Sequence, residues 1–264
     1  YAYTRGNNVW AYHDRSNNNA GDPSRSAQSL TGTDPLNFDY VPNLAVDPTQ
    51  TTPVTNQQFA ITNLFYWNNI IHDVMYQYGF TEASANFQDD NQGRGGVGND
   101  HVNAEAQDGS GSNNANFSTP ADGGSGRMQM YLFNRNGASP LRDGDLDNGV
   151  VVHEYGHGIS NRLTGGGTSG CLGNAEQMGE GWSDFYAIMF TQNWATSNLN
   201  SGFTGRRTVG AYALNNVSNF PASPPNSGFR HYAYTTDMTV NPLTYADING
   251  PLLGTAVHNI GEVW

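Results

Sequence analysis

The chain has 264 residues, a formal net charge of −12 at pH 7, 36% hydrophobic and 12% aromatic residues, and no lysine. This length and composition suit a single domain with its own core. The negative charge argues against a nucleic-acid or anionic-membrane partner, and the lack of lysine excludes Schiff-base chemistry and a phosphate-binding P-loop.

The first 78 residues show two different sequence patterns. Residues 1–55 alternate short apolar segments, such as residues 9–12, with turns rich in Asn, Asp and Pro, which predicts strands and loops. Apolar residues then recur at helical spacing, so we expect one long helix over about residues 56–78. The residues that define this spacing are Leu64, Trp67, Ile71, Val74, Met75 and Tyr78.

Residues 84–126 are rich in Gly, Asn and Asp, and residues 93–98 match the Gly-x-Gly-x-x-Gly pattern. That pattern binds dinucleotides only when a buried strand precedes it and a helix follows. In this chain the residues before the match lack the pattern of a buried strand, and the residues after it lack a helical pattern. We therefore expect no nucleotide site in this segment.

Asp143, Asp145 and Asp147 have the spacing that opens a calcium-binding loop. An EF-hand would require Gly at position six, where this chain has Asn148, and its twelfth position would be Glu154, which belongs to another motif. The favoured interpretation is a set of solvated carboxylates near the positive end of the next helix, with a Ca²⁺ site elsewhere left open.

The segment from His153 to His157 has the pattern His-Glu-x-x-His. On a helix, residues four apart differ by only about 40° around the axis, so both imidazoles project from one face and can bind one Zn²⁺. Glu154 between them can take a proton from a zinc-activated water. Asp147 as N-cap and the glycines at 165–167 as a stop place the motif inside a helix.

Catalytic zinc has three protein ligands, so a third side chain is needed. The chain has six glutamates, and Glu176 and Glu180 follow the motif closely. Glu180 is the better ligand, because Asp184 lies four residues later on the same helix face and could accept the free N–H of a liganding histidine. The alternative, a solvated helix face, conflicts with the neighbouring Trp182 and Phe185.

Residues 200–254 contain repeated Gly, Pro and Asn, which predicts a long irregular connection. A last helix should begin near His258. An apolar stripe on this helix would consist of Val257, Ile260, Val263 and Trp264. Such a stripe requires a partner that covers it.

Six segments together resemble the fungalysin family of secreted zinc metallopeptidases. They are residues 63–80, 104–117, 127–133, 153–166, 171–174 and 178–185. The resemblance covers most of the chain and implies an extracellular, thermolysin-like endopeptidase that hydrolyses internal bonds of polypeptide substrates.

The resemblance also implies roles for single residues. Zn²⁺ would be held by His153, His157 and Glu180, with Glu154 as general base. These are the four residues that the helix geometry favours.

Two further segments resemble thermolysin-like substrate sites. Residues 113–117 resemble the edge strand that pairs with extended substrate, so Asn114 and Ala115 are candidate substrate-binding residues; an ordinary Asn-rich turn is the alternative. Residues 257–261 resemble the segment whose histidine donates a hydrogen bond to the tetrahedral intermediate, which makes His258 a candidate catalytic donor. The alternative is a polar histidine that opens a helix.

The expected fold is α+β, thermolysin-like, and divided in two. Residues 1–147 would form a β-rich subdomain with one long helix, and residues 148–264 would contain the active-site helix and the start of a helical subdomain. In the family the catalytic domain continues beyond this segment, so the helical part is expected to be truncated at Trp264. The missing C-terminal half or a cleaved propeptide is then an expected partner.

Cys171 is the only cysteine, so the chain has no internal disulfide, although a pairing with missing sequence is open. No run of about 18 apolar residues is present. Two functions other than an active peptidase remain at this stage. They are a catalytically incomplete zinc-binding part of a two-chain peptidase and a calcium-rich extracellular binding module with structural histidines.

Overall fold

The computed structural model describes most of the chain. The described residues are 1–50, 54–134, 137, 139–168, 170–193, 195, 205–220, 223–250, 253 and 256–263. Trp264 of the predicted apolar stripe and parts of the predicted connection at 200–254 lie outside this set. The structure is mixed α+β, as predicted.

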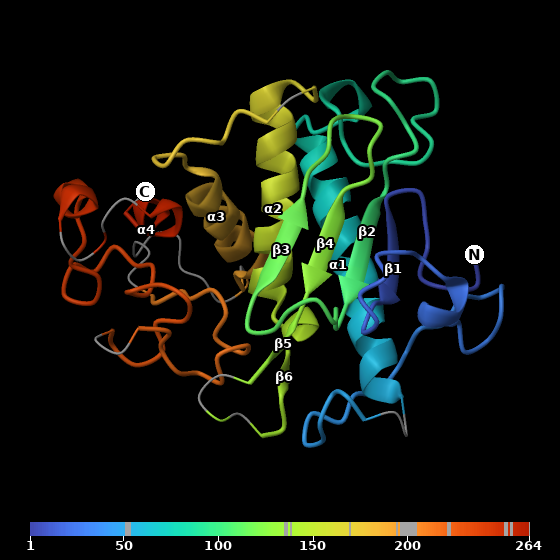
Figure 1. The fold of residues 1–264 in the computed structure, drawn as a ribbon, viewed down its shortest axis with the longest axis horizontal. Helices are drawn as coiled ribbons and strands as arrows, with labels where there is room; N and C mark the ends of the chain where they lie inside the picture. Colours follow the sequence, from blue (N-terminus) through green and yellow to red (C-terminus); the bar gives the residue numbers. More distant parts are fainter. Residues whose placement is uncertain are drawn as a thin grey trace.

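A four-stranded sheet in the order β1-β2-β4-β3 forms the centre of the molecule (Figure 1). The three strands β1, β2 and β4 are parallel, and β3 runs antiparallel to β4 at one edge. A second, two-stranded sheet is formed by β5 and β6. The strand bounds are β1 Val9–His13, β2 Val102–Ala106, β3 Ala115–Ser118, β4 Arg127–Met130, β5 Leu132–Phe133 and β6 Arg142–Asp143.

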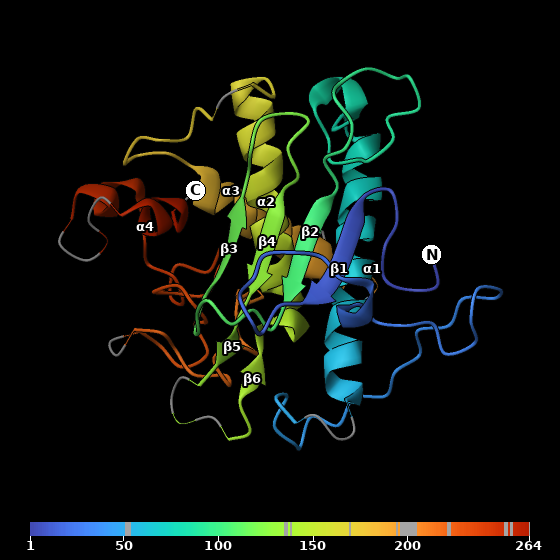
Figure 2. The same ribbon diagram turned by 45° about the vertical axis from the view of Figure 1, so that its right-hand side comes forward.

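Both long helices lie on the same face of the sheet (Figure 2). α1 contacts β1 and β2, whereas α2 contacts β3 and β4. α3 packs mainly on α2, and the short α4 packs on α3. The helix bounds are α1 Thr55–Gln77, α2 Asn148–Gly165, α3 Gly179–Thr191 and α4 Val257–Gly261. None of the described helices is both long and apolar enough to cross a membrane.

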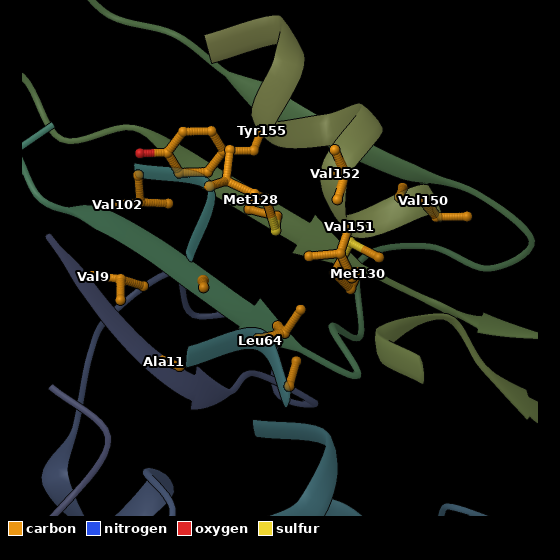
Figure 3. Packing of buried hydrophobic residues seen from close by; sticks show 14 of the residues in the cluster. Val9, Ala11, Leu64, Val102, Met128, Met130, Val150, Val151, Val152 and Tyr155 are labelled. Atoms are coloured by element: carbon orange, nitrogen blue, oxygen red, sulfur yellow. The ribbon is translucent and has the colours of Figure 1, made fainter. Parts of the chain in front are cut away.

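The core lies between the sheet and these two helices (Figure 3). The inward residues of each strand alternate with outward ones, as the two-residue period of a strand requires. β1 contributes Val9 and Ala11, and β4 contributes Met128 and Met130. Valines of the first turn of α2 and Tyr155 cover them.

α1 has nearly the predicted bounds, but its buried face is narrower than predicted. Leu64 and Ile71 are fully buried, whereas Val74 and Tyr78 are 38% and 82% exposed. Met75 of the last turns is buried, whereas Tyr78 is the C-cap residue and follows the last helical residue, Gln77.

One further prediction was wrong. The carboxylates of Asp143, Asp145 and Asp147 are buried rather than solvated. Asp145 accepts the backbone N–H of Gln107, and Asp147 accepts that of Ala213, so both join distant segments.

Candidate metal centre and cleft

α2 begins and ends where the sequence predicts. The side chain of Asp147 accepts the backbone N–H of Val150 at 3.4 Å, which caps the first turn. Gly166 ends the helix in the left-handed conformation, with φ of 68°. His153 and His157 therefore lie one turn apart in the middle of a well-capped helix.

Three side chains converge at the junction of α2 and α3. Nε2 of His153 is 3.0 Å from Oε2 of Glu180 and 3.1 Å from Nε2 of His157, and the third side of the triangle, from His157 to Glu180, is 3.5 Å. A tetrahedral ion with bonds of about 2.0–2.2 Å holds its ligand atoms roughly 3.3 Å apart. The donor set and its spacing thus fit Zn²⁺. Glu176 is exposed and takes no part in this group.

Asp184 orients one of these histidines. Its Oδ1 accepts the Nδ1–H of His153 at 2.7 Å, which leaves the Nε2 lone pair directed at the group of three. Asp184 also accepts two hydrogen bonds from Arg230, at 2.5 and 2.8 Å, and one from the hydroxyl of Tyr234 at 2.5 Å. The hydrogen bond from His153 to Asp184 that the spacing predicted is present, and Arg230 and Tyr234 are two additional donors to this carboxylate.

The groups around the two carboxylates hold them in their ionised form. Burial alone would raise the pKa of Asp184, but the guanidinium of Arg230 and the ring of His153 hold it well below its usual range. Burial also opposes ionisation of Glu180, whereas the rings of His153 and His157 lower the pKa of this carboxyl strongly. Although burial lowers the pKa of His153, its hydrogen bonds to Asp184 and Glu180 raise it to about 10. Both carboxylates thus stay ionised beside the imidazoles.

The side chains of His153, His157 and Glu180 line a cleft of about 710 Å³. Glu154 is buried and lines this cleft beside the two histidines, and its burial raises the pKa of the carboxyl. His258 also lines the cleft, with Nε2 3.3 Å from Oε2 of Glu180 and 56% of its side chain exposed. Tyr155 points away from the cleft and packs against Phe87.

β3 forms a further wall of the cleft. Asn114, immediately before this strand, is exposed, and Ala115 is its first residue; both line the cleft. β3 is bonded to β4 on one side and to no other described strand, so it is an edge strand, as predicted. The sequence-predicted site residues are therefore brought together around one cleft.

A close contact between two glycines sets the position of α4 on α3. A Cβ atom at Gly261 would lie 2.5 Å from the Cα of Gly181, and one at Gly181 would lie 2.7 Å from the Cα of Gly261. Real Cβ atoms do not approach other atoms so closely, so only glycine permits this backbone contact. Gly181 follows Glu180, and Gly261 lies on the same helix face as His258. The contact therefore brings His258 to Glu180.

The sequence analysis missed Arg230 and Tyr234. They lie 46 and 50 residues beyond their shared acceptor, Asp184, in a Pro- and Asn-rich segment without helical or strand periodicity. The only local signal is a dense group of aromatic residues around Arg230. Such a group does not indicate which carboxylate it contacts.

We expect Glu180→Ala to lose zinc and Glu176→Ala to keep it, because only Glu180 closes the triangle with the histidines. Zinc per chain after dialysis, measured by elemental analysis, checks this. Loss of zinc from the Glu176 variant alone would contradict the assigned ligand.

We expect Asp184→Asn to bind zinc about 10–100-fold more weakly, because the histidine loses the carboxylate that orients it. Competition with a chromogenic chelator measures the dissociation constant. Asp237→Asn, which changes a partly exposed carboxylate that accepts hydrogen bonds from Thr239 in its own turn, is the matched control. An unchanged constant in the Asp184 variant would contradict the orienting role.

Comparisons with known proteins identify the family of this chain. The family model described as fungalysin metallopeptidase matches residues 1–264. Extracellular metalloproteinase 2 of Trichophyton tonsurans is 43% identical over 267 residues, and the homologue of Arthroderma gypseum is 45% identical over 269 residues. Extracellular metalloproteinase MEP of Pyricularia oryzae is 44% identical over 267 residues. Each alignment covers 100% of this chain and 38% of the relative. The chain belongs to the fungalysin metallopeptidase family.

Proposed function

We propose that this chain carries the catalytic centre of a secreted zinc endopeptidase that hydrolyses internal bonds of polypeptides. The observation that carries the proposal is the triangle formed by His153, His157 and Glu180, which opens into a cleft bordered by an edge strand. The family match and the extracellular metalloproteinase names of the relatives support the same function.

The substrate would bind as an added strand. β3 offers the backbone groups of its outer edge to an extended peptide, and Asn114 adds a side-chain amide at the start of that edge. Recognition through the main chain does not require a free chain end. This mode of binding favours cleavage inside a polypeptide.

Zn²⁺ held by the three ligands would polarise the scissile carbonyl and make water more acidic. Glu154 would accept the proton of the attacking water and deliver it to the leaving nitrogen. His258 would donate a hydrogen bond to the oxygen that gains negative charge. The hydrogen bond from His153 to Asp184 would keep the ligand geometry constant during these steps.

A thermolysin-like architecture with a division near residue 147 is part of the proposal. The curated relatives extend well beyond the matched region, since the chain spans 38% of their length. A helical second half and a propeptide are therefore proposed partners of this segment. The two alternative functions are not favoured, because the metallopeptidase family match covers the whole chain.

Glu154→Gln should keep zinc but lower kcat by about 10²–10⁴-fold, because glutamine preserves the shape of the side chain and cannot act as a base. Turnover of an unfolded fluorogenic protein and zinc content are measured together. Glu176→Gln serves as the control. Near-normal turnover of the zinc-loaded Glu154 variant would refute its role as base.

Gly261→Ala should lower kcat about tenfold or more, with KM and zinc content little changed, because the added methyl group displaces His258 from its donor position. In a His258→Ala background the same substitution should cost little more, since the group that it displaces is already absent. Gly173→Ala, where nothing lies within 4 Å of the added Cβ, is the control. Losses that multiply in the double variant would show that Gly261 acts independently of His258.

A further inference from the structure

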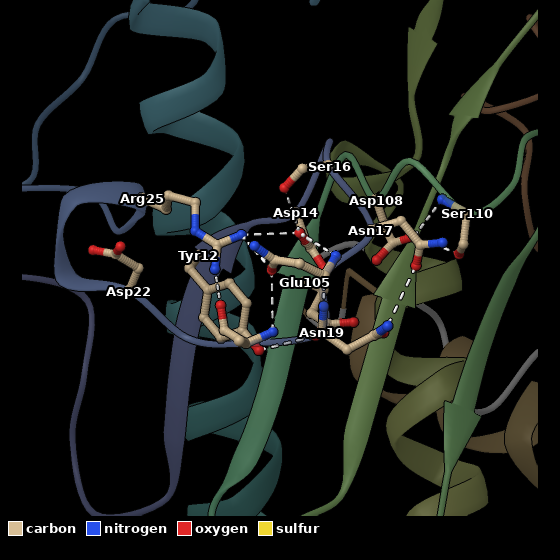
Figure 4. Close-up of polar contacts among 12 residues, drawn as sticks. Tyr12, Asp14, Ser16, Asn17, Asn19, Asp22, Arg25, Glu105, Asp108 and Ser110 are labelled. Carbon is tan, nitrogen blue, oxygen red and sulfur yellow. Dashed lines mark hydrogen bonds and ion pairs between the residues drawn. The ribbon is translucent and has the colours of Figure 1, made fainter.

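A polar cluster lies on the face of the sheet opposite the helices (Figure 4). Tyr12 and Glu105 alternate with the core residues of β1 and β2, so they point to this outer face. Both side chains are nevertheless buried. Residues 14–26 fold back over the strands and cover them, with Ser26 accepting the indole N–H of Trp10.

Three carboxylates meet beneath this cover. Asp14 follows β1, Glu105 belongs to β2 and Asp108 follows β2, and all three are buried. Each offers an oxygen that lies within 4.8 Å of the oxygens of the other two. Buried like charges at this separation repel one another unless they are compensated.

The cations of the described residues compensate the cluster only in part. Arg25 donates to Oδ1 of Asp14 at 2.9 Å. Nε of Arg127 lies 4.0 Å from Oε2 of Glu105, which is beyond hydrogen-bond distance. Asp108 accepts from Ser110 and Gln129, which are neutral. Three carboxylates thus face two guanidiniums, one of them distant.

One oxygen of Glu105 has no hydrogen-bond donor. Oε1 accepts the hydroxyl of Tyr12 at 2.9 Å, whereas Oε2 is buried and receives no hydrogen bond from any described residue. Burial, with a contribution from Asp108, raises the pKa of Glu105 to about 7. An acceptor in this state requires either a proton or a further cation.

We propose that Asp14, Glu105 and Asp108 bind a calcium ion on the outer face of the sheet. Ca²⁺ takes six to eight oxygen ligands at about 2.3–2.6 Å, so oxygens up to roughly 5 Å apart can share one ion, and the oxygens of this cluster lie within that limit. Mg²⁺ requires near-ideal octahedral geometry and usually keeps several waters, and Zn²⁺ favours the imidazoles of the other site.

The ion would fix the covering segment to the sheet. Asn19 of this segment already accepts hydrogen bonds from Arg127 and Gln129 of β4, at 2.7 and 3.4 Å. A calcium ion shared between Asp14 and the two acids of the β2 region would add a second attachment. None of the three acids lines the catalytic cleft, so the ion acts on stability and is independent of the proposed peptidase chemistry.

Terbium luminescence tests the site in the natural protein that contains this chain, after removal of metals and reloading with one equivalent of zinc. Tyr12, bonded to Glu105, should sensitise emission from one Tb³⁺ per chain, and Ca²⁺ should displace it at lower concentration than Mg²⁺. Glu105→Gln and Asp108→Asn should each weaken Tb³⁺ binding at least about tenfold, since each removes a charged ligand. Asp39→Asn, an exposed acid, should not.

Thermal unfolding supplies a second measurement. If Ca²⁺ is present at about 100 times its dissociation constant, the unfolding temperature should rise by roughly 5–10 °C in the wild type and much less in Glu105→Gln. Wild-type protein with neither sensitised emission nor a calcium-dependent shift would overturn the proposal, even if neither variant folds. Equal emission and shift in wild type and both variants would also overturn it, because the ion would then bind elsewhere.

Discussion

Asp184 is 1% exposed, and its carboxylate accepts hydrogen bonds from three residues in two separate parts of the chain. It joins α3, on which it lies, to His153 of α2 and to the segment that carries Arg230 and Tyr234. A buried carboxylate is stable only when donors surround it, and here one of the donors is a cation. The same contact that satisfies Asp184 also directs Nε2 of His153 toward Glu180. Packing of the helices and geometry of the metal centre therefore depend on one interaction.

The sheet supplies the second requirement, which is a fixed edge beside the centre. β3 is held by β4 on its inner side, and α2 covers both strands. Because α2 also carries the histidines, the edge strand and the proposed metal ligands belong to one packed unit. The distance between this edge and Glu154, the proposed base, is then set by core packing between α2 and the sheet.

The two clusters of ionisable groups differ in how their charges are balanced. Around Glu180 and Asp184, imidazoles and the guanidinium of Arg230 lower the carboxyl pKa values. Around Glu105, burial dominates and raises the pKa, because the nearest guanidinium is 4.0 Å away. One site is organised by hydrogen bonds before any ion binds, whereas the other retains an unbalanced charge. This difference suits a catalytic centre and a stabilising cation site, respectively.

The sequence by itself determined the parts of the molecule that depend on helix geometry. A turn of α-helix fixes residues four apart on one face, so the pairing of His153 with His157 and of Glu180 with Asp184 followed from spacing, as did the cap at Asp147. Tertiary structure alone decided the contacts that join distant segments. These contacts are Arg230 with Asp184, Gly261 with Gly181, and Glu105 with Asp14. Each depends on the path of the chain between the two residues, and the periodicity of the local sequence does not predict that path. The burial of Asp145 was mispredicted for the same reason, since its partner Gln107 lies 38 residues away.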